Sequence, residues 1–157
     1  MDIERYIPHR LPMRLIDRLV LSEPDKVVTE ATISTDNAFY AAVQQGVPAW
    51  TGIEFMAQTA AVWLGLADER AGRSIEPAFL ISARQYHAHQ PVFALGQVLR
   101  VEVKVGLFEA QIVSFSGRIV DAGDPQWVLA DAEFSAFRPD DPDAYLAASE
   151  PPGLESS

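Results

Sequence analysis

The chain has no cysteine, which excludes disulfides, thiol nucleophiles and cysteine-bound metals. Positive charge is also scarce, because 12 Lys and Arg residues stand against 22 Asp and Glu residues, a net charge of −10. This balance argues against nucleic acid or an anionic membrane surface as the main partner. Only three histidines are present, without a third ligand at metal-binding spacing, and phosphate or dinucleotide loops are missing. We therefore expect no metal and no resident cofactor.

Long hydrophobic runs are missing too. The N-terminal residues MDIERYIPHR are charged and contain a proline, unlike a secretory signal. The least polar segment, residues 53–67, is too short and too interrupted to span a bilayer. We therefore expect a cytoplasmic protein without a membrane partner.

Composition divides the chain into a body and a tail. Residues 138–157 contain five acidic residues and four prolines against one arginine, so they cannot bury enough surface to offset their ordering entropy. We expect this tail to be disordered. Residues 1–137 contain no internal repeat and no linker, and they are long enough for one domain with a hydrophobic core.

Periodicity predicts a sheet of five to six antiparallel strands. In VLRVEVKV (98–105), apolar and charged residues alternate strictly, which is typical of a strand with one buried face. Turns such as SEPD at 22–25 and AGDP at 122–125 separate several of the segments. The predicted strands are residues 13–21, 26–34, 78–86, 98–105, 109–121 and 126–137.

One long helix is predicted over residues 51–71, with Arg70 in its basic last turn and Gly72 as the stop signal. The helix is apolar on nearly every side, so it belongs in the interior. One buried helix against antiparallel strands predicts an α+β hot-dog fold, in which the sheet wraps around the central helix.

Glu54 is a carboxylate in an otherwise apolar helix, so its presence needs an explanation. Between residues 53 and 67 only Glu54, Gln58 and Thr59 are polar, and Gln58 lies one turn after Glu54 on the same face. Thr51 and Glu54 fit a capping box, in which each side chain satisfies a backbone amide of the other. The other interpretation is a catalytic or ligand-binding carboxylate, because a buried carboxylate is costly to keep without a reason.

Three segments resemble the β-hydroxyacyl-acyl-carrier-protein dehydratases. These are IPHRLPMRLIDRLV (7–20), GIEFMAQTAA (52–61) and QPVFALGQVLRVEVKV (90–105), in the order found in that family. The stretch VPAWTGIEFMAQ (47–58) and the strand AFLISARQY (78–86) are similar to an atypical dehydratase-like branch of aryl-polyene biosynthesis.

The resemblance implies a dimeric hot-dog enzyme that removes water from a 3-hydroxyacyl chain carried on the phosphopantetheine of acyl carrier protein. The acyl chain would lie in a tunnel between protomers, where a histidine and a glutamate act together. Glu54 corresponds to the glutamate, and burial would raise its pKa toward the range useful for acid–base chemistry. Gln58, Gly52, Trp50 and Arg84 are the expected substrate-binding residues, with Gly52 at the helix start and Arg84 contacting phosphate.

The family histidine is missing, because counting back fourteen residues from Glu54 leads to Tyr40. Tyr40 is one candidate to replace it as a catalytic residue, although an unperturbed phenol is a poor base near neutrality. His87 and His89 are further candidates, which would reach the site from the end of a strand. His9 is set aside, because its PHR motif resembles a structural turn.

A partner subunit is the favoured source of the histidine. The chain would then be one half of a heterodimer with a related hot-dog dehydratase, in fatty-acid or polyene biosynthesis. A homodimer, a hot-dog thioesterase that uses Glu54 alone and a non-catalytic binding subunit are the alternatives. In each case acyl carrier protein would be the carrier of the substrate, and it would need a local basic surface for docking.

Overall fold

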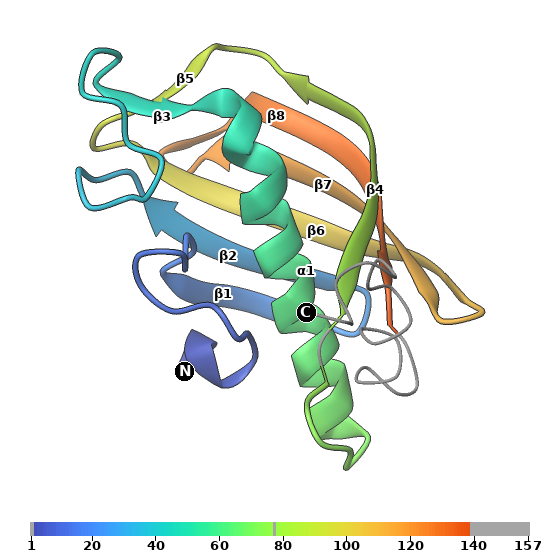
Figure 1. The fold of residues 1–157 in the computed structure, drawn as a ribbon. Helices are drawn as coiled ribbons and strands as arrows, with labels where there is room; N and C mark the ends of the chain where they lie inside the picture. Colours follow the sequence, from blue (N-terminus) through green and yellow to red (C-terminus); the bar gives the residue numbers. More distant parts are fainter. Residues whose placement is uncertain (1, 77, 139–157) are drawn as a thin grey trace, which may run out of the picture.

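The computed structural model describes residues 2–76 and 78–138, except for the side chains of residues 79–81 and 84. One long helix lies across the concave face of a curved antiparallel sheet (Figure 1). In chain order the elements are η1 (Ile3–Arg5), β1 (Arg18–Glu23), β2 (Lys26–Thr32), β3 (Gly46–Pro48), η2 (Ala49–Thr51), α1 (Gly52–Arg70), β4 (Phe79–Ala88), β5 (Val92–Ala94), β6 (Val98–Glu109), β7 (Ile112–Asp121) and β8 (Asp124–Phe137).

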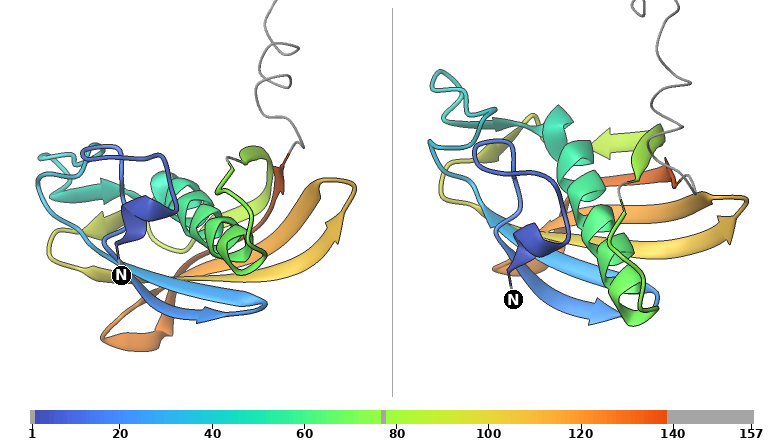
Figure 2. Two further views of the ribbon diagram at one scale, coloured as in Figure 1. Left: turned by 90° about the horizontal axis from the view of Figure 1, so that it is seen from below. Right: turned by 60° about the horizontal axis from the view of Figure 1, so that its bottom comes forward.

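The main sheet has six strands in the order β1-β2-β6-β7-β8-β4, and β3 pairs with β5 in a separate two-stranded sheet. All of these pairings are antiparallel. The predicted α+β hot-dog architecture is therefore confirmed. Figure 2 shows the sheet curving around α1, with the N-terminal segment on the same side of the sheet as the helix.

The core forms between α1 and the inward-facing residues of the sheet. In β6 the alternation predicted from sequence holds, because Leu99, Val101 and Val103 are fully buried. Phe55 and Met56 of α1 are also fully buried against this layer. Complete burial of such side chains contributes roughly 1.5–3 kcal/mol each, so this layer provides the main stabilisation of the fold.

The first strand starts later than predicted. Residues 13–17 were expected to form part of a strand, but β1 begins at Arg18. The side chain of Gln58 explains the difference, because its Oε1 accepts from the backbone N–H of Leu15 at 2.8 Å and its Nε2 donates to the carbonyl of Met13 at 2.9 Å. These backbone groups therefore pair with α1 instead of with a neighbouring strand.

The short strands β3 and β5 were not predicted. Each has three residues, and a proline lies within or next to each. Three residues cannot display a period-two pattern, so only the tertiary pairing of Val47 with Phe93 reveals them.

Glu30, on β2, is a buried carboxylate between two arginines. Arg18 of β1 donates to Glu30 Oε1, and the guanidinium of Arg100 on β6 lies 2.9 Å from Oε2. Burial by itself raises the pKa of Glu30, but the hydrogen bonds and charges of Arg100 and Arg18 outweigh burial and hold the pKa below its ordinary value of 4.5. The ionised form is therefore favoured by folding.

We expect Glu30→Gln to destabilise the fold most near neutral pH. Because the folded-state pKa of Glu30 is lowered, the stabilisation is present above the unfolded pKa and is lost as pH falls through the folded value. Urea denaturation at about pH 7 and about pH 4 should show the gap between the wild type and Glu30→Gln shrinking at the lower pH. A gap that is independent of pH would contradict this prediction.

Among the described residues, no helix is long and apolar enough to cross a membrane.

Arg138 was assigned to the tail, yet its guanidinium bonds to Asp68 and its backbone N–H to Gln111, so this residue lies with the folded body. The remainder of the predicted tail, residues 139–157, lies outside the described residues.

Candidate active site

Glu54 lies in the first turn of α1 and lines a mostly apolar cavity of about 270 Å³. The cavity runs along one face of α1 toward β8. Short side chains on facing elements leave this space unfilled. The lining residues are His9, Glu54, Gln58, Leu64, Phe134 and the five alanines Ala57, Ala60, Ala61, Ala78 and Ala136.

The capping-box interpretation of Glu54 is wrong. Thr51 has helical backbone angles, φ −72° and ψ −9°, and makes no side-chain cap bond to the helix. Its hydroxyl instead donates to the carbonyl of Pro48 at 2.7 Å. Glu54 is therefore not tied to Thr51, and its Oε1 accepts a hydrogen bond of 3.3 Å from Gln58 Nε2.

The expectation that Glu54 is buried is also wrong for the single chain. Its side chain is 40% exposed, whereas Gln58, one turn later, is only 1% exposed. The reason is local, because the N-terminal segment covers Gln58, whose amide bonds to the backbone of Met13 and Leu15, and leaves Glu54 partly exposed. The carboxylate can therefore be reached by a ligand that enters the cavity.

Gln58 was predicted to bind substrate, and the structure shows what its amide contacts within this chain. Both amide atoms bond to the backbone of the segment that contains Met13 and Leu15, and the nitrogen also reaches Glu54. Removing the amide would leave buried backbone groups unpaired, at a cost of about 1–3 kcal/mol. Gln58 thus holds the N-terminal segment on the helix beside Glu54.

Gly52 packs directly under the ring of Tyr86. Tyr86 Oη donates to the carbonyl of Ala49, and a Cβ at position 52 would lie only 2.0 Å from Oη. Burial raises the pKa of the Tyr86 phenol to about 12; a hydrogen bond with the Gly52 backbone opposes the rise and Asp131 adds to it. The phenol therefore stays protonated at neutral pH and can keep donating to Ala49.

We expect Gly52→Ala to lower the free energy of unfolding by about 1–3 kcal/mol, the usual cost of overpacking, despite the better helix propensity of alanine. Tyr86→Phe should reverse part of the loss, because it removes the hydroxyl that the new Cβ meets. Thermal unfolding of the two single variants and the double variant measures both effects. Additive losses would show that the two side chains do not meet.

Trp50 and Tyr40, two other predicted site residues, are not among the residues that line the cavity. Trp50 is 65% exposed, with its ring edge-on to Phe39 at a centroid distance of 5.8 Å. Tyr40 is half-buried against the core, in the loop between β2 and β3. The backbone of Arg84 pairs with Glu133 across β4 and β8, but its side chain lies outside the described part of the structure. Of the predicted site residues with described side chains, the cavity lining contains Glu54 and Gln58 but not Trp50 or Tyr40.

His9 is the residue of this site that sequence reasoning missed. Its Nε2 lies 3.7 Å from Glu54 Oε1, and the two side chains line the same cavity. The PHR motif gave the only signal, and it was interpreted as a structural turn. His87 and His89 instead face Asp131 at 3.5 and 2.6 Å, outside the cavity lining. No cluster of metal-ligand side chains was found in the described part of the chain.

The fold and the site define a hot-dog protein with a reachable carboxylate at an apolar cavity. The chain belongs to the ApeP-like family, described as ApeP dehydratase, whose family model matches residues 1–147. The resemblance noted in the sequence is thereby confirmed, and the chain is a dehydratase-like lyase.

Curated relatives agree with this class. The 3-hydroxyacyl-(acyl-carrier-protein) dehydratase FabZ of Cereibacter sphaeroides is 31% identical over 140 residues, covering 86% of each chain. The FabZ of Chlamydia trachomatis is 28% identical over 143 residues, covering 84% of this chain and 92% of the relative.

Solved structures show the same architecture. The dehydratase heterocomplex ApeI:P from Xenorhabdus doucetiae matches with a TM-score of 0.84 and 25% identity, covering 96% of this chain and 99% of the matched chain. Zebrafish thioesterase superfamily member 2 matches with a TM-score of 0.60 and 9% identity over 77% of this chain and 80% of its own, which shows the fold alone.

Proposed function

We propose that this protein takes part in the dehydration of 3-hydroxyacyl thioesters carried on acyl carrier protein, with Glu54 as a proton-transfer group. The observation that carries the proposal is the position of Glu54, which lies in the first turn of α1, lines a mostly apolar cavity and has a side chain that is 40% exposed. Dehydration needs a group that removes the proton beside the thioester carbonyl and a group that helps the hydroxyl to leave. A partly exposed carboxylate next to a space for an acyl chain suits the first of these steps.

We propose that the working form is a heterodimer with a related hot-dog dehydratase. Three observations support this. The family histidine position is occupied by Tyr40, which does not line the cavity. Glu54 is 40% exposed, so a second subunit would have to cover it to exclude water from the reacting atoms. The related ApeI:P structure is itself a heterocomplex. A second copy of this chain would cover the site equally well. The identity of the partner therefore distinguishes a homodimer from a heterodimer.

Acyl carrier protein is the proposed carrier of the substrate, as it is for the FabZ relatives by name. An acidic carrier needs a local basic surface, because the body of this chain is itself acidic. The N-terminal arginines are largely engaged, since Arg10 and Arg14 pair with Glu4 at 3.4 and 3.0 Å. Arg84 remains the predicted contact for the phosphate of the phosphopantetheine arm.

The direct test is an intact-mass assay of a 3-hydroxyacyl carrier protein. It is incubated with this protein alone, with a related histidine-containing hot-dog dehydratase alone, and with both. We expect loss of one water to be fastest in the mixture. Release of the free carrier thiol would instead identify a thioesterase. No water loss beyond the rate of the partner alone would contradict the proposal.

A further inference from the structure

His9 is the only histidine among the described residues that line the cavity. His9 comes from the N-terminal segment and Glu54 from α1, and the fold places His9 Nε2 3.7 Å from Glu54 Oε1. The His9 side chain is 31% exposed and that of Glu54 is 40% exposed, so a ligand in the cavity can reach both. A proton donor and a proton acceptor therefore lie side by side where the substrate would react.

Hydrogen bonds hold the N-terminal segment in place on both sides of His9. The guanidinium of Arg10 donates to the carbonyls of Ile7 at 2.9 Å and His9 at 3.0 Å, which closes the turn around the histidine. Further along, Gln58 holds Met13 at 2.9 Å and donates to Glu54 at 3.3 Å. One buried amide thus fixes both the histidine segment and the carboxylate, which is the support that an acid–base pair needs.

Only one nitrogen of the His9 ring can exchange protons with a ligand. Nδ1 is buried and has no hydrogen-bond partner among the described residues, whereas Nε2 faces Glu54. The other two histidines cannot substitute, because His87 and His89 face Asp131 away from the cavity lining.

We infer that His9 is the second proton-transfer group of the dehydration and pairs with Glu54 within one chain. This inference rests on the proposed function. The step requires Glu54 as the carboxylate and His9 with a transferable proton on Nε2, the nitrogen that lies 3.7 Å from Glu54 Oε1. Glu54 takes the proton from C2 of the 3-hydroxyacyl thioester, and the electron pair of the C2–H bond forms the C2=C3 double bond. The C3–O bond breaks, and Nε2 of His9 gives its proton to the departing hydroxyl, which leaves as water.

The short distance between Glu54 and His9 also allows their starting protonation states to be restored. After one turnover Glu54 holds a proton and His9 has lost one, so transfer from the carboxyl to Nε2 regenerates the starting state without an outside acid or base. C2 and C3 are bonded neighbours, so two groups 3.7 Å apart can serve both atoms in one pose. The role of the partner subunit is then to close the cavity, not to supply the histidine.

The test compares His9→Gln and His9→Asn with His87→Gln as the matched control, in the complex of this chain with its hot-dog partner. We expect both His9 variants to lower kcat by about 100-fold or more, with KM within a few-fold and the thermal unfolding midpoint unchanged. His87→Gln should behave as wild type. Added imidazole should restore part of the activity of a third variant, His9→Ala, which a purely structural role would not allow.

Chemical modification tests the wild type without any variant. Diethyl pyrocarbonate is applied to the complex, and the modified histidines are mapped by mass spectrometry with and without acyl carrier protein bearing a non-reactive acyl chain. We expect modification of His9 to track the loss of activity and to be slowed by the acyl carrier protein. Full modification of His9 with activity retained would overturn the inference.

The failures of the two proposals are distinguishable. Activity that depends on Glu54 but not on His9, and that disappears when a histidine of the partner is replaced, would overturn the role of His9 while leaving the dehydratase in place. A wild-type complex that removes no water faster than the partner alone would overturn both. A loss of stability equal to the loss of activity in the His9 variants, without rescue by imidazole, would assign His9 to holding the N-terminal segment.

Discussion

Replacing Glu54 with glutamine should lower kcat/KM for dehydration by about 100- to 10,000-fold, the usual contribution of a positioned acid or base. Glutamine keeps the size of the side chain and can still contact Gln58, which is 3.3 Å from the carboxylate oxygen. It cannot accept the C2 proton. Steady-state rates with a 3-hydroxyacyl carrier protein measure the effect, and the thermal unfolding midpoint should stay unchanged because Glu54 is 40% exposed.

Glu133→Gln is the matched control for this loss. Glu133 precedes Phe134 on β8, and successive residues of a strand point to opposite faces, so its side chain faces away from the cavity that Phe134 lines. The control should keep wild-type activity. A Glu54→Gln variant that is as active as Glu133→Gln would contradict the assignment of Glu54 and favour a non-catalytic subunit.

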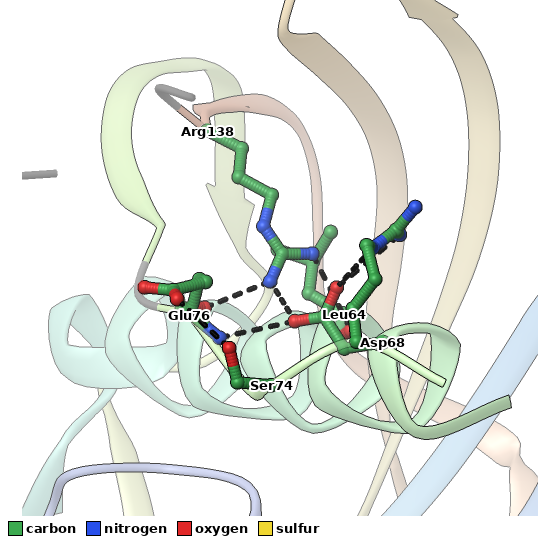
Figure 3. Close-up of polar contacts among 6 residues, drawn as sticks. Leu64, Asp68, Ser74, Glu76 and Arg138 are labelled. Atoms are coloured by element: carbon green, nitrogen blue, oxygen red, sulfur yellow. Dashed lines mark hydrogen bonds and ion pairs between the residues drawn. The ribbon is translucent and has the colours of Figure 1, made fainter. Parts of the chain in front are cut away.

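Replacing Asp68 with alanine should cost about 3–5 kcal/mol of folding free energy, the range for breaking a buried ion pair from one side. Asp68 is 1% exposed, and its carboxylate bonds to Arg138, to Arg73 at 3.3 Å and to the backbone N–H of Glu76 at 3.1 Å. Arg138 also donates to the carbonyl of Glu76 at 2.9 Å (Figure 3). The alanine variant would leave the Arg138 guanidinium, itself 10% exposed, without its carboxylate.

The neighbouring residue supplies the comparison. Glu69 lies next to Asp68 on α1 and pairs with Arg5 of η1 at 2.7 Å, but the side chain of Glu69 is 40% exposed. An exposed ion pair contributes little, although Tyr6 Oη also donates to Glu69 at 3.3 Å, so Glu69→Ala should cost much less than Asp68→Ala. Urea denaturation of the two variants at one protein concentration separates the cases. Equal losses would mean that burial does not determine the strength of the Asp68 pair.

The difference between Asp68 and Glu69 also shows what could be anticipated from sequence. The helix ends near Arg70 and Gly72, as predicted. The stop signal, a basic last turn followed by glycine, is contained within a few consecutive residues and can be recognised from sequence. The partner of Asp68 could not be anticipated. Arg138 lies 70 positions away in a segment assigned to the tail, and only the path of β8 brings it to the helix.

The candidate site also has features that the sequence predicted and features that it did not. Glu54 and Gln58 were found because a helix places residues four apart on one face, whatever surrounds it. The exposure of Glu54 was predicted wrongly, because burial depends on the alanines and the N-terminal segment that pack beside the first turn. The pairing with His9 was missed, because 45 positions of chain separate the two residues and no local pattern connects them.

By itself, the sequence determined the class of this protein. Strand alternation, the apolar helix and the order of three motifs are local or near-local properties, and they suffice for a hot-dog dehydratase-like domain. Tertiary structure alone decided which polar groups meet. The cavity, the contact between His9 and Glu54 and the buried pair of Asp68 with Arg138 are formed by segments that are distant in the chain. Short-range periodicity carries no information about such contacts, since they arise only when the sheet curves around the helix.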